Sequence, residues 1–224
     1  MAHGALIVQR PISRPSSRRT ADSKEPFLRS PDWWLFFTKF LRQGKAIASV
    51  TPSSPWLARA LVQGIELGQA RCVIELGAGT GPITAELLRS ASPGCRVVIV
   101  ERDADFCQRL RRRFPQADVV QSDATELESL LQQRRLESVD HVISGLPLPS
   151  FPAPERDRLL KVVARKLTPA GTFRQLTHMP WVYYRLYRRY FSDVEFCFVP
   201  LNIPPGGFYI CRGYCYEERM KAEG

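Results

Sequence analysis

Short apolar runs alternate with segments of helical periodicity through most of this 224-residue chain. Runs rich in Val and Ile are typical of buried strands, and the segments between them repeat apolar residues at helical spacing. We expect strands over 71–76, 96–101, 117–121, 139–144, 171–176, 194–199 and 207–215. We expect helices over 81–90, 103–113, 124–134, 155–167 and 180–190. This alternation predicts an α/β fold with a doubly wound, mostly parallel sheet of seven strands, in which the last strand pair forms an antiparallel edge.

The N-terminal part of the chain does not follow this alternation. Residues 1–29 are rich in Arg, Ser and Pro and predict a disordered basic arm. Residues 30–66 predict amphipathic or lid helices. The remaining divisions are a ligand-binding domain over 67–216 and a short tail, 217–224. A chain of this length fits one core of that kind, and we expect a monomer.

The first of the N-terminal helices, within 31–42, has an almost wholly aromatic or apolar surface with basic residues around it. It is too short to span a bilayer. Such a segment either packs over the domain as a lid or lies at a lipid headgroup boundary, and both alternatives are open. The side chains that would contact a lipid surface are Trp33, Trp34, Phe37, Lys39 and Arg42.

A second segment, 181–191, interleaves aromatic residues with arginines. This composition suits lipid phosphates at an interface and stacked single-stranded RNA bases equally well. It is also compatible with ordinary core packing. The candidates for substrate or membrane contact are Tyr183, Tyr184 and Arg185.

Composition narrows the class of protein. The net charge of +10, from 32 basic and 22 acidic residues, favours anionic partners, and nucleic acid and anionic lipid both qualify. No apolar run approaches the roughly 18 residues of a membrane span, and the N-terminus has no secretory signal pattern, so we expect a cytoplasmic protein. The six cysteines show no paired spacing and the three histidines form no cluster. We therefore expect free thiols and no metal site.

The run into three alternating glycines is the clearest functional signal. Gly77, Gly79 and Gly81 follow an apolar strand and precede a helix, and glycine lets the backbone turn tightly and approach a ligand closely. A dinucleotide-binding loop has another glycine three residues after the second, where this chain has Pro82, so NAD and FAD are disfavoured. The pattern acidic-Leu-Gly-x-Gly-x-Gly resembles the first motif of the Rossmann-like class I methyltransferases, which use S-adenosylmethionine.

Polar residues at the ends of neighbouring strands extend this candidate site. Glu101 ends a strand about twenty residues after the glycines, where a carboxylate accepts both ribose hydroxyls. Asp123 either contacts adenine or caps the next helix, and Glu75 either orients the sulfonium end of the cofactor or satisfies loop amides. These side chains should converge with Ser144 on one crevice beside the glycines. The candidate cofactor residues are Thr51, Ser53, Glu75, Gly77, Ala78, Gly79, Gly81, Glu101, Arg102, Ser122, Asp123, Ala124 and Ser144.

The loop after the fourth strand carries a more specific resemblance. The stretch 142–152, together with 48–54 and 201–205, resembles bacterial phosphatidylethanolamine N-methyltransferases, and the likeness covers roughly 33–212. Those enzymes are similar in turn to ribosomal RNA adenine dimethyltransferases, whose corresponding loop reads Asn-Leu-Pro followed by Tyr or Phe. This chain has neither that Asn nor an aromatic residue after Pro147. It therefore lacks the groups with which the base-modifying enzymes hold a flipped adenine.

The resemblance implies methyl transfer from S-adenosylmethionine to the amine of phosphatidylethanolamine, by a cytoplasmic protein bound peripherally at the inner membrane face. It implies that Ser144, Gly145 and Leu146 orient the amine. His178, where the family typically has Tyr, or solvent then takes the proton. The alternatives are an RNA adenine methyltransferase or another methyltransferase, and a non-catalytic membrane- or RNA-binding module of the same fold.

Overall fold

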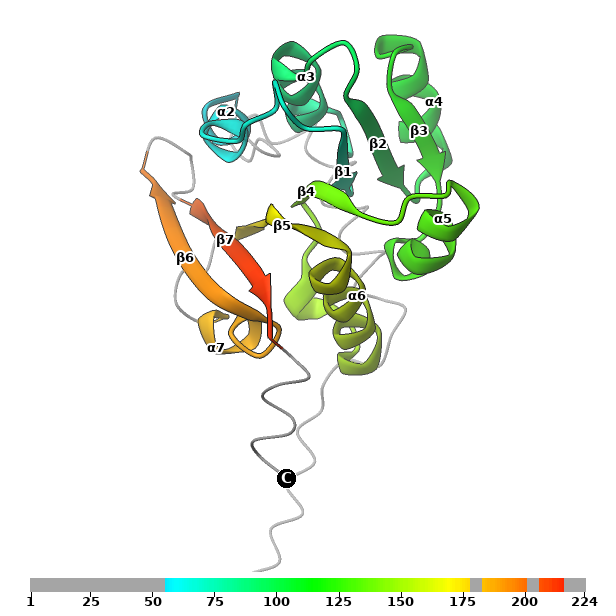
Figure 1. Cartoon of the computed structure of the whole chain (residues 1–224). Coiled ribbons are helices and arrows are strands. Elements are labelled where there is room, and N and C mark those ends of the chain that lie inside the picture. The colour runs from blue at the N-terminus through cyan, green and yellow to red at the C-terminus, as the bar shows by residue number, and fades with distance from the viewer. Residues whose placement is uncertain (1–54, 178–182, 201–205, 216–224) are drawn as a thin grey trace, which may run out of the picture.

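The computed structural model describes residues 55–177, 183–200 and 206–215 (Figure 1). Its centre is a seven-stranded sheet in the order β3-β2-β1-β4-β5-β7-β6. The strands are β1 Cys72–Leu76, β2 Arg96–Glu101, β3 Asp118–Gln121, β4 Val139–Ser144, β5 Leu167–Thr177, β6 Phe191–Val199 and β7 Gly206–Tyr214. Strands β1 to β5 pair in parallel, whereas β7 is antiparallel to both of its neighbours, β5 and β6. The expected fold, a mostly parallel sheet with an antiparallel hairpin at one edge, is confirmed.

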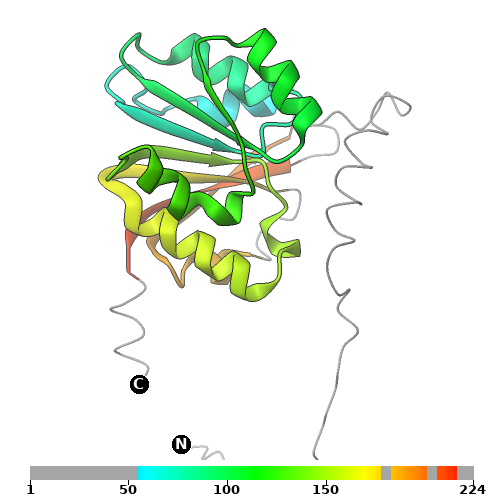
Figure 2. The same ribbon diagram turned by 90° about the vertical axis from the view of Figure 1, so that its right-hand side faces the viewer.

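Helices cover both faces of this sheet (Figure 2). They are α2 Pro55–Val62, α3 Pro82–Ser90, α4 Ala104–Arg113, α5 Leu127–Gln133, α6 Ala153–Lys166 and α7 Tyr184–Tyr187. Two short 3-10 turns, η1 Ala124–Glu126 and η2 Leu148–Ser150, follow β3 and β4. The helix expected over 124–134 is therefore divided, because the Asp123 side chain caps η1 by accepting the Thr125 amide at 2.9 Å.

Strand alternation divides the apolar residues between two cores. On β1, Val73 belongs to the cluster under α2, α3 and α4, and its neighbour Ile74 belongs to the cluster under α5 and α6. All five residues of β1 are buried, as expected for a central parallel strand with helices on both faces. This packing fixes the carboxyl end of β1, where the glycine loop begins.

The aromatic and basic segment before β6 is largely core. Tyr187, Tyr190 and Phe191 are at most 1% exposed, and the Phe191 ring stacks on Phe173 at 5.7 Å between centroids. The Tyr190 amide donates to the Tyr187 carbonyl, so the chain turns there and β6 begins. The helix expected over 180–190 is thus only α7 within the described residues.

The three contact candidates in this segment differ in exposure. Tyr183 is half-buried and packs against the core, whereas Tyr184 and Arg185 are exposed. The candidates Trp33, Trp34, Phe37, Lys39 and Arg42, and the whole of 1–54, lie outside the described residues. Among the helices that the structure describes, none is long and apolar enough to cross a membrane.

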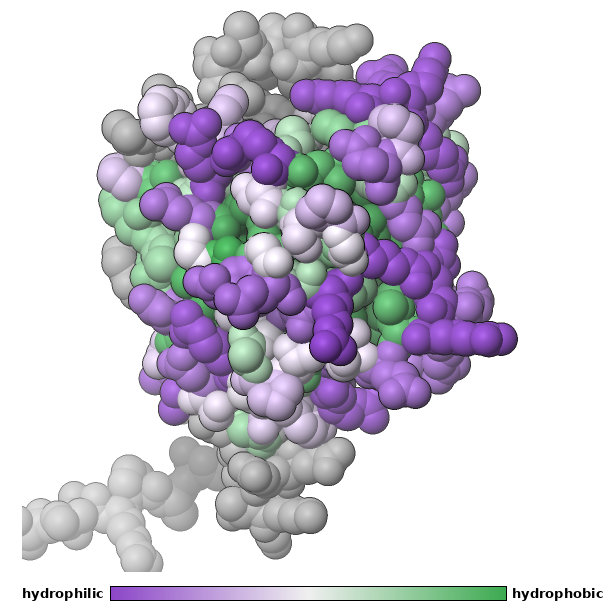
Figure 3. Space-filling view, turned by 45° about the horizontal axis from the view of Figure 1, so that its top comes forward, coloured by the Kyte–Doolittle hydropathy of each residue, from purple (hydrophilic) through white to green (hydrophobic). Residues whose placement is uncertain are grey.

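The surface over α4 is strongly hydrophilic, as the right-hand side of Figure 3 shows. The last turn of this helix carries Arg111, Arg112 and Arg113. The Arg113 guanidinium donates to the Thr80 carbonyl at 3.2 Å, which ties α4 to the glycine loop. Three positive charges therefore gather at the end of α4, and one of them contacts this loop.

A buried arginine joins α2 to the sheet. Arg174 on β5 is 3% exposed, and its Nη1 donates to the Leu61 and Gln63 carbonyls, both at 2.7 Å. These carbonyls belong to the end of α2 and the residue just beyond it, where helical carbonyls lack partners and a cation is favourable. Burial lowers the pKa of Arg174 only to about 10, so the charge persists at neutral pH. Arg174 therefore fixes α2 on the sheet.

We expect Arg174→Met to lower the free energy of unfolding by about 2 kcal/mol, because it leaves buried carbonyls at the end of α2 without their donor. Urea unfolding monitored by circular dichroism measures this change. Arg158→Met, at an exposed position of α6, is the control and should stay within about 0.5 kcal/mol of the parent. Equal stability of the two variants would contradict the role of Arg174.

Candidate functional site

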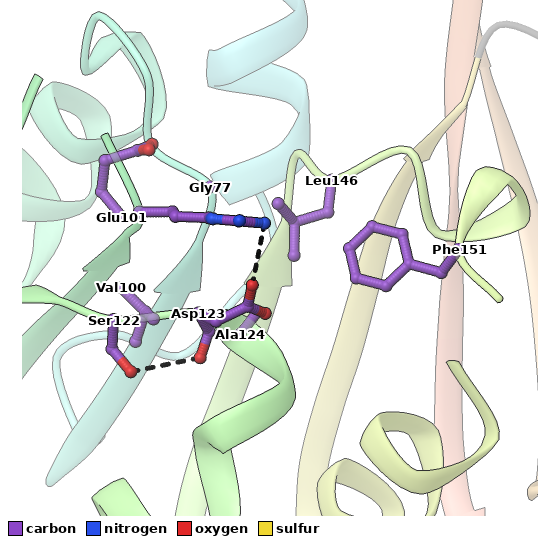
Figure 4. A pocket seen from close by; sticks show the side chains of 9 residues that line it. Gly77, Val100, Glu101, Ser122, Asp123, Ala124, Leu146 and Phe151 are labelled. Carbon is purple, nitrogen blue, oxygen red and sulfur yellow. Dashed lines mark hydrogen bonds and ion pairs between the residues drawn. The ribbon is translucent and has the colours of Figure 1, made fainter. Parts of the chain in front are cut away.

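A pocket opens at the carboxyl ends of four neighbouring strands, β1 to β4 (Figure 4). Its walls come from the loops that follow these strands and from the last residues of β2. The lining residues are Gly77, Val100, Glu101, Arg102, Ser122, Asp123, Ala124, Leu146 and Phe151. The pocket therefore lies where ligands bind in open parallel sheets.

Glu101 is held rigidly at the pocket wall. It is 3% exposed, its Oε2 accepts the Gly79 amide at 2.9 Å and its Oε1 accepts the Asp103 amide at 2.9 Å. Burial raises the pKa of this carboxyl, and the Asp103 and Gly79 amides partly offset that rise. These amides fix the orientation of the carboxylate at the pocket wall, where it can accept a hydroxyl group.

The glycine loop and the loop after β4 touch where no side chain fits. Gly77 has a φ of 75°, and a Cβ there would overlap the Leu146 side chain. On the opposite side, a Cβ on Gly145 would lie 3.1 Å from the Gly77 carbonyl oxygen. Glycine at both positions therefore lets the two loops approach at the pocket wall.

Asp123 makes two sets of contacts. One carboxylate oxygen accepts the Thr125 amide and hydroxyl, at 2.9 and 2.8 Å. The other pairs with Arg102, a second lining residue of the pocket, at 3.1 Å. The capping alternative is therefore observed, and contact with adenine stays a prediction.

Glu75 is fully buried behind the glycine loop. Its Oε2 accepts the Thr84 hydroxyl at 2.6 Å, and Thr84 lies in the first turn of α3, whose own N-cap, Gly81, has no side chain to offer. Its Oε1 is buried, and no residue in the described part of the chain donates to it. Burial raises the pKa of Glu75 to about 8, although the Thr84 hydrogen bond opposes this. The observed hydrogen bond ties β1 to α3 rather than binding a loop amide, and the orientation of the sulfonium end of the cofactor by Glu75 stays a prediction.

The loop after β4 is fixed by local hydrogen bonds. The Ser144 hydroxyl accepts the Leu146 amide at 3.3 Å, and the Gly145 amide donates to the Leu76 carbonyl at 3.0 Å. Pro147, with φ −77° and ψ 61°, forms an inverse γ-turn in which the Leu148 amide donates to the Leu146 carbonyl at 2.9 Å. The 3-10 turn that follows carries the chain to Phe151, at the pocket wall.

The structure thus divides the candidate residues into three groups. Those that line the pocket are Gly77, Glu101, Arg102, Ser122, Asp123, Ala124 and Leu146. Those that lie around it without lining it are Glu75, Ala78, Gly79, Gly81, Ser144 and Gly145. Those outside the described residues are Thr51, Ser53 and His178.

Two further pocket residues, Val100 and Phe151, had no assigned role in the sequence. Val100 directly precedes Glu101 at the end of β2, and this position was a signal that it could line the pocket. Phe151 had a weaker signal, an aromatic residue closing the proline-rich stretch 147–152.

Comparison with known proteins agrees with this geometry. Residues 73–171 match a family model described as a methyltransferase domain. A methyltransferase of Burkholderia thailandensis, 1,6-didemethyltoxoflavin-N1-methyltransferase with bound S-adenosylhomocysteine, superimposes with a TM-score of 0.62 at 17% identity, over 88% of this chain and 98% of that one. A Bacillus cereus O-methyltransferase in complex with S-adenosylhomocysteine gives a TM-score of 0.56 at 15% identity, over 83% and 91% of the chains. The fold is that of enzymes that use S-adenosylmethionine.

The chain belongs to the class I S-adenosylmethionine-dependent methyltransferases. Within this class it is 52% identical over 185 residues to the ornithine lipid N-methyltransferase of Singulisphaera acidiphila, covering 81% of this chain and 96% of that protein. A ribosomal RNA small subunit methyltransferase A of Synechococcus is 33% identical over 105 residues, which are 42% of this chain and 36% of that protein. The expected class and cofactor are confirmed.

We expect Gly77→Ala to weaken S-adenosylmethionine binding at least about tenfold, because Ala disfavours a positive φ and its Cβ displaces Leu146. Calorimetric titration measures the dissociation constant. Gly94→Ala is the matched control, since a Cβ there meets no atom within 4 Å. Unchanged binding by Gly77→Ala would show that the loop contact does not shape the cofactor site.

Glu75 predicts a specific pH dependence of stability. With a pKa near 8 in the folded state and 4.5 when unpaired, it is protonated in the folded protein at pH 6–7 and ionised in the unfolded chain. Stability therefore falls as pH rises from about 4.5 to 8, by up to about 1.4 kcal/mol per pH unit. Glu75→Gln should lose this slope, whereas the exposed Glu66→Gln should keep it. Urea unfolding from pH 5.5 to 8.5 measures both, and parallel curves for all three proteins would contradict the assignment.

Proposed function

We propose that this protein transfers methyl groups from S-adenosylmethionine to the amine of a membrane lipid headgroup, with ornithine lipid as the first candidate. The observation that carries the proposal is the 52% identity to an ornithine lipid N-methyltransferase across 96% of that protein. Phosphatidylethanolamine, which the loop after β4 suggests by resemblance, is the second candidate. Both headgroups present an alkyl amine.

The pocket residues suit the parts of S-adenosylmethionine. Glu101, with both oxygens oriented by amides, accepts the ribose hydroxyls. Val100, Leu146 and Phe151 offer apolar walls to the adenine ring, and Asp123 with Ser122 contacts its polar edge. When bound, the cofactor supplies an electrophilic methyl group. The task of the protein is then to align the amine and exclude water.

The loop after β4 offers a backbone carbonyl to the amine, next to the glycine loop. The Leu146 carbonyl accepts from Leu148, and the Pro147 carbonyl accepts the Ser150 amide at 2.8 Å. No described residue donates to the Gly145 carbonyl, which lies in the loop that packs on Gly77. The Gly145 carbonyl therefore accepts the N–H of the amine and holds its nitrogen beside the cofactor loop. His178 or solvent takes the proton that an alkylammonium must lose before attack.

An exposed aromatic residue marks the same edge of the sheet. Phe198 is 58% exposed and pairs with Gly207, which pairs in turn with Thr177 at the carboxyl end of β5. It therefore projects near the edge at which the pocket opens. This placement supports a peripheral protein that works at the inner membrane face, with Phe198 at the lipid boundary.

An RNA adenine methyltransferase is the second candidate function, because a 105-residue stretch is 33% identical to a ribosomal RNA enzyme. Base-modifying enzymes stack and hydrogen-bond a flipped base. The loop here presents Ser144 and Gly145 at the positions of the amide, and the Ser144 hydroxyl is buried and already bonded to Leu146. This arrangement favours a flexible alkyl amine over a planar base.

Transfer of a labelled methyl group distinguishes these substrates. We expect incorporation into vesicles that contain ornithine lipid, less into vesicles with phosphatidylethanolamine, and none above background into phosphatidylcholine, whose nitrogen is fully methylated. Ribosomal RNA in place of vesicles should stay unlabelled. Labelled RNA with unlabelled vesicles would overturn the lipid assignment, and a preference for phosphatidylethanolamine would exchange the two lipid candidates.

A further inference from the structure

One buried side chain beside the pocket has no role in the site described so far. Gln175 on β5 is 1% exposed and stands in register between Ser144 of β4 and Tyr209 of β7. Its Nε2 donates to the Leu146 carbonyl at 2.7 Å and to the Leu176 carbonyl at 2.8 Å. Because both partners are acceptors, the atom between them must be the amide nitrogen, and the orientation of the amide is settled.

The backbone of Leu146 is consequently held by three hydrogen bonds. Its amide donates to the Ser144 hydroxyl, and its carbonyl accepts from both Leu148 and Gln175. With two donors, this carbonyl has no lone pair left for a substrate. The Leu146 side chain, fixed by the same peptide, lies on Gly77 and lines the pocket. Gln175 thus connects β5 to the point where the two loops meet.

Gln175 does this at a cost to stability. Its Oε1 is buried and accepts no hydrogen bond from the residues that the structure describes, and a buried acceptor without a donor costs about 1–3 kcal/mol. An apolar side chain of the same shape would avoid this cost. A buried polar group that is only partly satisfied requires an explanation beyond packing, and here the explanation lies in the loop that its nitrogen holds.

We propose that Gln175 is a positioning residue for methyl transfer. It occupies the Leu146 carbonyl, so that the neighbouring Gly145 carbonyl is the one that accepts from the amine, and it keeps the Leu146 side chain against the cofactor loop. The inference rests on the proposed transfer to an amine. It assigns no contact between Gln175 and the substrate, because Gln175 acts through Leu146.

Gln175→Met tests this role, since Met keeps the length of the side chain and lacks both N–H donors. We expect kcat for the aminolipid to fall about 30-fold or more, because small displacements of an aligned group are costly. The dissociation constant of S-adenosylmethionine should change less than about threefold, and the melting temperature should stay within about 3 °C, because the unpartnered Oε1 is removed as well. Thr172→Val, on the same strand with a side-chain bond to His141 of β4, controls for general damage to the β4–β5 pair.

Two outcomes would overturn the proposal. One is an unchanged kcat. The other is that both Gln175→Met and Thr172→Val lose kcat and that their melting temperatures fall by the same amount. This result would indicate a structural role only.

Hydrogen exchange separates this proposal from the proposed function. In the ligand-free protein, we expect the Leu146 and Leu148 amides to exchange at least about tenfold faster in Gln175→Met than in the parent. This measurement needs no substrate. If the parent protein methylates no aminolipid, the proposed function is wrong. The exchange rates of the two amides still test whether Gln175 holds the loop after β4. Unchanged exchange would overturn the positioning role, whatever the substrate is.

Discussion

The close contact between the loop after β1 and the loop after β4 is the constraint on which the site depends. Gly77 and Gly145 meet without side chains between them, and Leu146 covers the first of these glycines. Three backbone amides of these loops are bonded to neighbouring strands. The Gly77 amide donates to the Val100 carbonyl of β2, and the Gly79 amide donates to the Glu101 carboxylate. The Gly145 amide donates to the Leu76 carbonyl of β1. The loop that would face the methyl donor and the loop that would face the acceptor are therefore one packed unit.

The strands and the pocket edge were predictable because their signals are local. Runs such as 72–76 and 96–101 carry the Val and Ile pattern of buried strands, and in parallel sheets their carboxyl ends meet at one edge. Glu101 could be placed at the pocket from its position after such a run. Local signals also made the helix expected over 180–190 too long. Its aromatic residues fit a helical pattern, although Tyr190 packs in the core and Phe191 begins β6.

What the sequence does not reveal depends on partners far away along the chain. Arg174 bonds to the Leu61 carbonyl, 113 residues earlier, and no local pattern distinguishes it from an exposed strand arginine. Gln175 bonds to Leu146, 29 residues earlier, and its importance follows from the carbonyl it occupies. Glu75 bonds to Thr84 of α3, a contact that neither of its two alternatives in the sequence included. These are the side chains that join elements, and their roles exist only in the folded chain.

The place of β7 has a consequence for how the protein is made. The strand inserts between β5 and β6, pairing with both, yet it follows both of them in the chain and is synthesised after them. Until it arrives, β5 and β6 each have an open edge, and open edges invite pairing with other chains. The β5-β7-β6 part of the sheet can thus form only after β7 has been synthesised. A truncation before Gly206 would remove β7 and would also leave β6 without a strand to pair with, so two strands would be lost from the sheet.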